Sequence, residues 1–246
     1  MIPLRDTQSL SRTPVICYGL IGAMLLIFIA EIRLEITGEL QDWVAYWSLI
    51  PAEITGLFQE AIANQNPAIW TFLVWRIFAI VPALFIHSSY AQILGNLIFL
   101  FAFGRSIEDR IGRGYFLLFF VASGLITSSI RVALDPDMAL PIIGANSAIA
   151  ALLGAYIILV PHAKIDSILP LLIVFIPVKI SANFYILWWF IQQLSYGIGV
   201  LNINANASNL AGLFQQGLAI IMGMAIAYFW LKPIAQFNQE QKNKTK

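Results

Sequence analysis

The chain has 246 residues, of which 59% are hydrophobic and 11% charged, and its mean hydropathy is +0.80. Soluble domains carry about 25% charged residues and about 45–50% apolar ones, so this composition excludes an ordinary soluble domain. The formal net charge of +1 is uninformative by itself, whereas the distribution of the charges along the chain is informative. We therefore expect a multi-pass integral membrane protein whose main partner is the lipid bilayer.

Six apolar stretches are predicted to cross the membrane as helices in an all-α bundle. A helix needs about 20 apolar residues to cross the hydrocarbon core, and several of these stretches reach that length only with their polar flanks. The first has no small-residue cleavage site after it, so we expect a retained span and not a signal peptide. The six stretches are residues 15–30, 91–103, 115–130, 145–160, 184–195 and 210–231.

A further apolar segment, residues 168–180, is broken by Pro170 and Pro177 and flanked by Lys164 and Lys179. Proline removes a backbone donor and disfavours a straight helix. We expect this segment to lie at the membrane surface or to form a hairpin link. If it spans instead, the count becomes seven and the carboxyl terminus changes sides.

The basic residues are distributed asymmetrically across the six predicted spans. With the amino terminus in the cytoplasm, eleven of the 14 lysine and arginine residues lie on the cytoplasmic side. Only Arg33, Arg76 and Arg131 lie on the other side. Such an excess is typical of cytoplasmic loops. We expect both termini in the cytoplasm and, as location, the cytoplasmic or inner membrane of a bacterium.

The connection between the first two spans, residues 31–90, is long and contains Trp43, Trp47, Trp70 and Trp75. Tryptophan prefers the interface between headgroups and hydrocarbon, so we expect this loop to be partly embedded in the outer leaflet. No repeat or linker divides the chain, and we expect one domain over residues 1–246. Residues 233–246 are expected to form a short cytoplasmic tail, frayed from residue 239.

Four short patterns between residues 75 and 217 occur together in the order and spacing of one family. They are Trp75-Arg76, the segment from His87 to Asn96, the turn from Gly104 to Glu108, and the apolar helix that opens at Gly144 and includes Gly154. Together they resemble the bacterial type of the rhomboid family of intramembrane serine proteases. The resemblance implies a six-helix bundle and gives Trp75, Arg76, His87, Gly104, Glu108 and Gly154 structural roles.

In active rhomboids a serine at the start of span four pairs with a histidine on span six, and a histidine and an asparagine on span two stabilise the oxyanion. By this resemblance the serine position is Asn146 and the span-six histidine position is Asn209. The two oxyanion positions are Gln92 and Asn96. Three of the four positions therefore carry a different residue from the active family members, and we expect no catalytic residue among them.

The remaining residues offer no replacement for the missing base. A serine hydroxyl needs a neighbouring base to become a nucleophile. His87 is expected on the outer side, and His162 about a membrane thickness from Asn146; no lysine precedes Lys164. The sequence thus predicts a rhomboid-like pseudoprotease that binds the transmembrane segments of client proteins, in quality control or assembly.

Other interpretations stay open. The chain is an active intramembrane endopeptidase if Ser147 serves as a displaced nucleophile, although a small residue at a helix contact explains Ser147 as well. A small transporter or channel is disfavoured, because no predicted span carries a buried acidic or basic residue. The polar side chains Gln92, Asn96, Asn146, Asn209 and Gln193 either hold helices together as an amide network or bind substrate, and His87 has a structural alternative too.

No cofactor is expected. The single cysteine, Cys17, lies in the first span, and no metal-ligand spacing, nucleotide loop or nucleic-acid surface is visible. We expect the adjacent charges Arg105, Glu108, Asp109 and Arg110 to form an ion-pair turn at a helix end. Gln215 and Gln216 are expected either to face the bundle interior or to mark a partner site.

Overall fold

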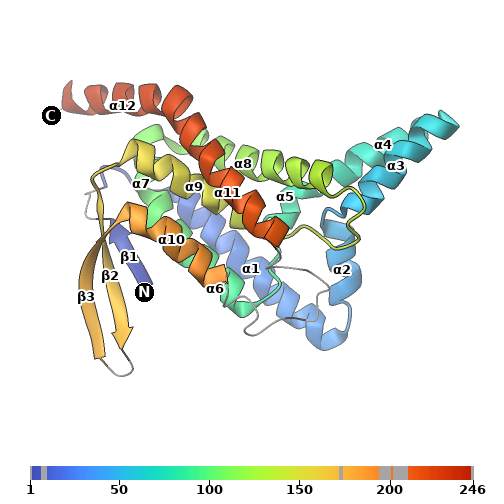
Figure 1. The fold of residues 1–246 in the computed structure, drawn as a ribbon, viewed down its shortest axis with the longest axis horizontal. Helices are drawn as coiled ribbons and strands as arrows, with labels where there is room; N and C mark the ends of the chain where they lie inside the picture. The colour runs from blue at the N-terminus through green and yellow to red at the C-terminus, as the bar shows by residue number, and fades with distance from the viewer. Residues whose placement is uncertain (1, 7–9, 172–173, 194–200, 202–209, 245–246) are drawn as a thin grey trace.

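A computed structural model describes residues 2–6, 10–171, 174–193, 201 and 210–244 (Figure 1). In this part of the chain, each predicted span coincides with a helix. They are α1 (Val15–Thr37), α6 (Tyr90–Phe99) with the π-helical turn Leu100–Gly104 and α7 (Arg105–Ile111), α8 (Arg113–Leu134), α9 (Asn146–Leu159), α10 (Ala182–Gln193), and α11 (Leu210–Ile226) with the π-helical turn Ala227–Leu231.

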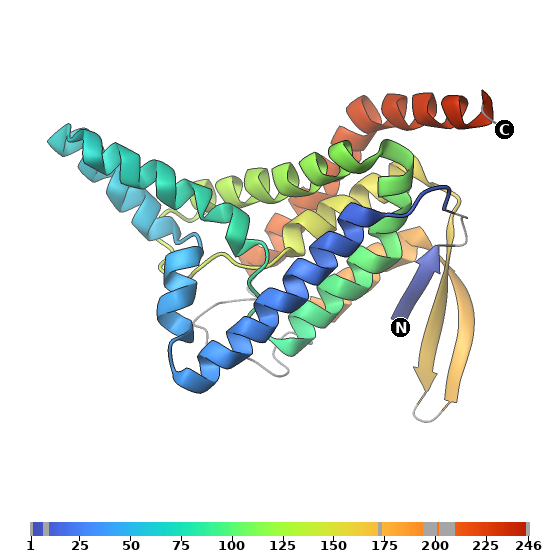
Figure 2. The ribbon, with the colours of Figure 1, turned by 180° about the vertical axis from the view of Figure 1, so that it is seen from behind.

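Four of the described helical stretches are long and apolar enough to cross a membrane, and α9 is a shorter apolar helix. The prediction of a helical membrane bundle is confirmed. Its centre is α9, whose residues from Ala148 to Tyr156 are all buried. A helix that is apolar all round belongs inside a bundle, and α8, α10 and α11 surround it in both views (Figure 2).

The connection after α1 consists of α2 (Leu40–Trp47), α3 (Pro51–Asn64), α4 (Pro67–Phe78) and the short α5 (Ile80–Ala83). Helices α3 and α4 form a hairpin that projects from the bundle (Figures 1 and 2). Its surface exposes apolar side chains, including Phe58, Trp70, Phe72 and Phe78. Such a surface suits the outer leaflet, and the embedding of this loop stays a prediction.

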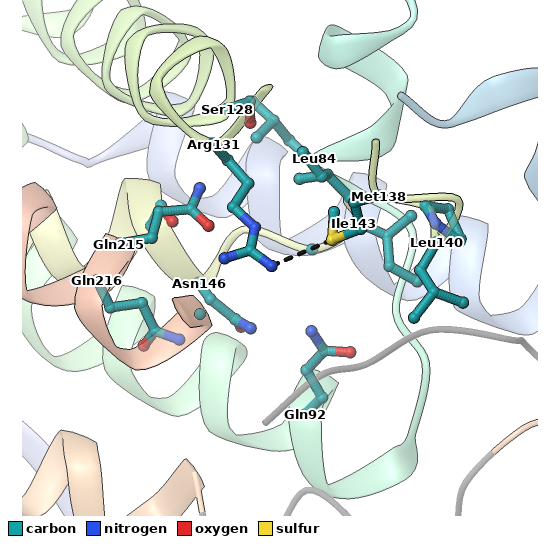
Figure 3. A pocket seen from close by; sticks show the side chains of 15 residues that line it. Leu84, Gln92, Ser128, Arg131, Met138, Leu140, Ile143, Asn146, Gln215 and Gln216 are labelled. Atoms are coloured by element: carbon teal, nitrogen blue, oxygen red, sulfur yellow. Dashed lines mark hydrogen bonds between the residues drawn. The ribbon is translucent and has the colours of Figure 1, made fainter. Parts of the chain in front are cut away.

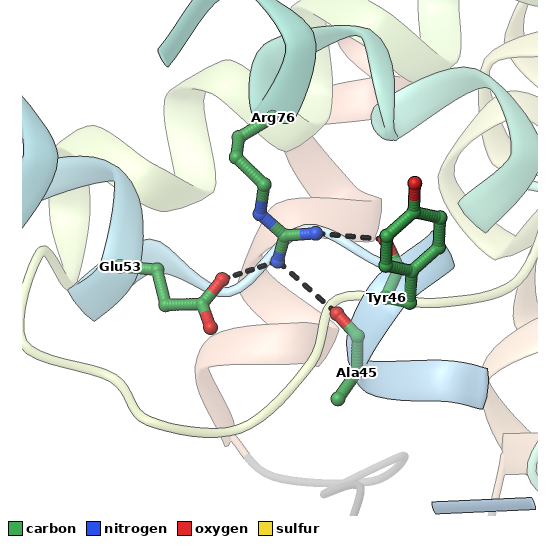
Figure 4. Close-up of polar contacts among 4 residues, drawn as sticks. All are labelled: Ala45, Tyr46, Glu53 and Arg76. Carbon is green, nitrogen blue, oxygen red and sulfur yellow. Dashed lines mark hydrogen bonds and ion pairs between the residues drawn. The ribbon is translucent and has the colours of Figure 1, made fainter. Parts of the chain in front are cut away.

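Arg76 fastens this hairpin to the rest of the loop. Its Nη1 donates to the Tyr46 carbonyl at 2.7 Å and its Nη2 to the Ala45 carbonyl at 3.1 Å, and it forms an ion pair with Glu53 (Figure 4). The two carbonyls belong to the last turn of α2, where backbone acceptors lack helical partners and favour a cation. Arg76 is buried, while its neighbour Trp75 is half exposed.

Residues 168–171 and 174–180 lie in paired strands and not in a helix. Strands β2 (Lys164–Leu171) and β3 (Val174–Ser181) pair antiparallel, and β1 (Ile2–Asp6) joins β2 on the other side. The expected hairpin link is therefore present, and the alternative of a seventh helical span is wrong. Pro170 and Pro177 explain the choice, because each would remove a helical hydrogen bond. The all-α bundle thus carries one small sheet.

The acidic residues of α7 hold the start of α1. Glu108 accepts hydrogen bonds from the backbone N–H groups of Ile16 (3.1 Å) and Cys17 (2.7 Å), and Asp109 accepts from those of Ser11 and Arg12. The first N–H groups of a helix have no helical acceptors, so carboxylates are stabilising there. Glu108 thus caps a distant helix and Asp109 binds the segment before it, while the expected ion-pair turn stays a prediction.

The chain after α11 continues as α12 (Lys232–Lys244), which extends away from the bundle (Figure 1). Asn238 Nδ2 donates to the carbonyl of Arg110 at 3.0 Å and anchors α12 to the end of α7. The expectation of a frayed tail from residue 239 is therefore wrong for the described residues. The helix continues beyond the apolar run into polar residues, and hydropathy alone does not predict this extension.

Candidate functional site

A cavity of about 70 Å³ lies at the amino-terminal end of α9 (Figure 3). Helices α6, α8, α9 and α11 and the connection from Met138 to Gly144 line it. Among the described lining residues, the polar side chains are those of Gln92, Ser128, Arg131, Asn146, Ser147, Gln215 and Gln216. The structure therefore brings together Gln92, Asn146 and Ser147, which the sequence had placed at the site.

Asn146 is the first residue of α9, and its side chain points into the cavity (Figure 3). It is 8% exposed, and its Oδ1 has no hydrogen-bond partner among the described residues. The preceding Gly144 has φ +90, and a Cβ there would lie 2.6 Å from Gln92 Nε2, so the turn into α9 requires glycine. Asn209 lies outside the described residues, so its predicted bond with Asn146 stays a prediction.

Gln92, which the resemblance assigns to an oxyanion position, forms its hydrogen bonds within the turn before α6. Its Oε1 accepts hydrogen bonds from the backbone N–H (2.7 Å) and the hydroxyl (2.9 Å) of Ser88. Ser89 Oγ in turn caps α6 by accepting from the Gln92 N–H at 3.1 Å. The acceptor end of this amide is thus occupied within its own turn.

Asn96, the fourth position, binds His87 and lies outside the cavity lining. His87 Nδ1 donates to the Phe85 carbonyl at 2.9 Å, so the neutral ring accepts at Nε2 from Asn96 Nδ2 at 3.0 Å. Burial lowers the pKa of His87 from 6.5 to about 4 and keeps the ring neutral. Both ring nitrogens are engaged, and the backbone N–H of His87 donates to Glu31 Oε1 at 3.0 Å.

Charged residues are buried inside helices of the bundle, contrary to expectation. Glu31 lies in α1 and Arg131 in the last turn of α8, and both are buried. The sequence placed them in outer loops because the apolar runs end before them, but both helices continue beyond those runs. The argument that no span carries a buried charge is therefore wrong. Arg131, directly after its apolar run, is the site residue that the sequence analysis missed.

Among the described residues that line the cavity, none is a proton acceptor for Ser147. Its described polar groups are amides, hydroxyls and the guanidinium of Arg131, none of which takes a proton from serine at neutral pH. His162 follows the opposite end of α9, and the 14 residues of that helix span about 20 Å. Among the described residues, no group of three metal-binding side chains comes together either.

Gln215 and Gln216 on α11 face the bundle interior and link helices. Gln215 Nε2 donates to the Thr127 carbonyl of α8 at 3.0 Å, and Gln216 Oε1 accepts from Trp189 Nε1 of α10 at 2.7 Å. Interhelical hydrogen bonds of this kind contribute about 0.6 kcal/mol each in membranes. These two residues therefore hold α8, α10 and α11 together around the cavity; the side chain of Gln193 lies outside the described part.

Comparison with known proteins adds two findings. The sequence model of the family described as "Rhomboid domain" matches residues 71–233, more than half of the chain. A protein of Bacillus subtilis (strain 168) named "Putative rhomboid protease YdcA" is 28% identical over 111 residues. That alignment covers 45% of this chain and 54% of the relative, so the chain spans about half the length of the relative it matches.

Proposed function

The chain belongs to the rhomboid family, and from this premise we propose that it is a pseudoprotease, which binds transmembrane segments of other proteins without cleaving them. The observation that carries the proposal is the Asn146 amide at the head of α9, inside the cavity. An amide is no nucleophile, and it stands where the active family members have serine. Membrane-protein quality control or assembly is the role that we assign to this binding.

The loss extends beyond the nucleophile. Serine hydrolysis needs a base to take the hydroxyl proton, and removing either group of such a pair costs several orders of magnitude in rate. His87 has both ring nitrogens engaged and is neutral and buried, while Gln92 has its acceptor on Ser88. His87 and Gln92 thus perform structural tasks.

The scaffold around the cavity supports a retained binding role. Arg76 still joins α4 to α2, Glu108 still caps α1, and Gly154 still admits α11 against α9. A protein that needed only a stable fold would not require a cavity lined by polar side chains, because buried polar groups without partners cost stability. We place the protein in the cytoplasmic membrane of a bacterium with both termini inside, supported by the distribution of basic residues.

A second candidate is an active endopeptidase that uses Ser147. One observation favours it: Ser147 lines the same cavity as Asn146. It would require a base from outside the described residues, and the helix-contact role of a small residue accounts for Ser147 without one.

Cleavage of a transmembrane reporter in proteoliposomes separates the two candidates. The proteins to compare are the wild type, Ser147→Ala, and the double variant Asn146→Ser/Asn209→His, with an active rhomboid as positive control. We expect no cleavage by the wild type and measurable cleavage by the double variant only. Wild-type cleavage that Ser147→Ala abolishes would establish a displaced nucleophile and refute the pseudoprotease. Client binding is tested separately, by photo-cross-linking from α6 and α10 to a single-span segment.

A further inference from the structure

Arg131 is the one charged side chain among the described residues that line the cavity, and it is 3% exposed. Burying a guanidinium is unfavourable unless its charge is paired and its N–H groups are hydrogen-bonded. Neither the family's catalytic positions nor the helix contacts described above use this residue. The partners that Arg131 has therefore decide whether it is a structural or a binding group.

The described partners of Arg131 are few. Both hydrogen bonds leave from Nη2, to Asp135 Oδ2 at 3.4 Å and to Met138 Sδ at 3.1 Å. Asp135 is half exposed, and a thioether is a weak acceptor. A guanidinium has five N–H donors arranged to hold a carboxylate with two parallel hydrogen bonds. Within the described residues, most of this capacity is unused.

The α9 end of the cavity offers donors for a negative group and one acceptor for an N–H group. The first-turn N–H groups of α9, those of Asn146, Ser147 and Ala148, have no helical acceptor, and Ala145 supplies no side-chain cap. Such a helix end carries a partial positive charge. Independently of the helix end, Asn146 is more than nine-tenths buried with Oδ1 unpartnered among the described residues. Figure 3 shows the side chains of Arg131, Asn146 and Gln92 converging on the same space.

We propose that this cavity binds a carboxylate carried by a client polypeptide, with Arg131 holding the carboxylate and Asn146 Oδ1 accepting a backbone N–H of the same segment. A small carboxylate such as acetate offers only acceptors and would leave Oδ1 unpaired, whereas a polypeptide offers a carboxylate and an N–H together. The volume of about 70 Å³ exceeds the roughly 10–15 Å³ that one water requires, so the end of a side chain or of a chain enters.

This inference rests on the proposed function, since it specifies which segments are bound. Arg131 lies at the end of α8 and Asn146 at the start of α9, so the cavity lies at one end of these helices. The preferred client therefore carries Asp, Glu or a chain terminus at the corresponding end of its span. Arg131 can bind such a carboxylate and keep its contact with Asp135, because that contact uses Nη2 alone.

The test measures the affinity of fluorescent single-span peptides for the purified protein in proteoliposomes. Three peptides differ at one position near that end, which is Asp, Asn or Lys. Two further peptides end at the same depth, one with a free carboxyl terminus and the other with an amidated one. Because hydrogen bonds to charged groups contribute about 1.5–3 kcal/mol, we expect the Asp peptide to bind about tenfold or more tightly than the Asn peptide. The terminal pair shows whether a chain end serves as well.

Variants assign the preference to Arg131. Arg131→Gln is expected to abolish the difference between the Asp and Asn peptides while still binding the Asn peptide. Arg131→Lys keeps the charge but lacks the planar guanidinium fork, so we expect it to retain part of the preference for the Asp peptide. The matched control is Arg33→Gln, which removes an exposed arginine from the same end of the bundle and should change nothing. Thermal unfolding of each variant identifies any that fails to fold.

Three results would overturn the inference. Equal, measurable affinity of the wild type for the Asp, Asn and Lys peptides refutes the carboxylate site and leaves client binding intact. A preference that survives in Arg131→Gln places the recognition elsewhere. Failure to bind any peptide refutes the proposed function together with the inference. If Arg131→Gln does not fold, the peptide series on the wild type decides by itself.

Discussion

Gly154 of α9 and Gly223 of α11 lie at a reciprocal contact between the two helices. A Cβ on Gly154 would come within 2.1 Å of the Ile220 carbonyl oxygen, and one on Gly223 within 2.0 Å of the Ala151 carbonyl oxygen. Each glycine thus leaves room for the backbone of the other helix. Small residues at interfaces allow this close approach in membranes, and here the contact positions Asn146 and Gln216 around one cavity.

Gly154→Ala is expected to destabilise the protein by about 1–3 kcal/mol, since the added methyl group meets a backbone carbonyl that cannot rotate away. The measurement is thermal or denaturant-induced unfolding in detergent micelles. Gly19→Ala is the matched control, because a Cβ there meets nothing within 4 Å. Equal stability of the two variants would contradict the close contact of α9 and α11.

Arg76→Lys is expected to loosen the α3–α4 hairpin although the charge is kept. A lysine ammonium cannot reproduce the fork that reaches the Ala45 and Tyr46 carbonyls and Glu53 together. Losing hydrogen bonds to a charged group costs about 1.5–3 kcal/mol each, and the last turn of α2 is left without its partner. Limited proteolysis should cut the hairpin faster than in the wild type, whereas Arg33→Lys should leave the rate unchanged. An unaltered rate in both variants would exclude Arg76 as the tether.

The contribution of His87 to stability is expected to be lost as pH falls below about 6.5. Burial lowers the pKa of His87 from 6.5 to about 4, so the unfolded chain binds a proton in this range and the folded chain does not. The contribution is complete above pH 6.5 and is lost as pH falls towards 4, by about 3 kcal/mol in total. The measurement is the unfolding midpoint in micelles at pH 7.5, 6 and 5.

Two variants isolate this effect from the titration of other groups. His87→Gln should flatten the pH dependence, with Glu31 still on the backbone N–H of residue 87. His162→Gln, at an exposed histidine, should keep the wild-type slope. A slope that persists in His87→Gln would assign the pH dependence to other side chains.

Glu108→Ala is expected to destabilise the amino-terminal end of α1 by about 0.5–2 kcal/mol, the usual cost of losing a helix cap. The carboxylate accepts from the N–H groups of Ile16 and Cys17, which have no helical acceptor. Hydrogen exchange of these two amides should accelerate, while the amides at the other end of α1 stay protected. Unchanged exchange at Ile16 and Cys17 would refute the capping role.

The positions of helices were predictable where the apolar run itself causes the segment to insert into the membrane as a helix. The run from Val15 and the run ending at Ile130 cross a bilayer whatever surrounds them, because length and hydropathy decide insertion. The ends were less predictable, since helices continue into polar residues once neighbours bury them. Glu31 and Arg131 illustrate this: both were counted as loop residues, and both are buried in helices.

The sheet and the caps depend on partners far apart in the chain. Pro170 and Pro177 argue against a helix, but no local pattern reveals that β1 pairs with β2 across more than 150 residues. Glu108 likewise accepts hydrogen bonds from the N–H groups of Ile16 and Cys17, which lie 92 and 91 residues away in the chain. Contacts of this kind form only when the helices pack, so local charge patterns do not reveal them.

The sequence by itself determined that the chain is a rhomboid-family membrane bundle and that an asparagine, Asn146, stands at the start of an apolar helix, because composition, run length and residue identity are local properties. Only the tertiary structure decided that Arg131, Asn146 and Gln92 share one cavity, that His87 is buried and engaged at both ring nitrogens, and that Gly154 touches α11. Burial and convergence depend on how helices pack against one another, and no single segment contains that information.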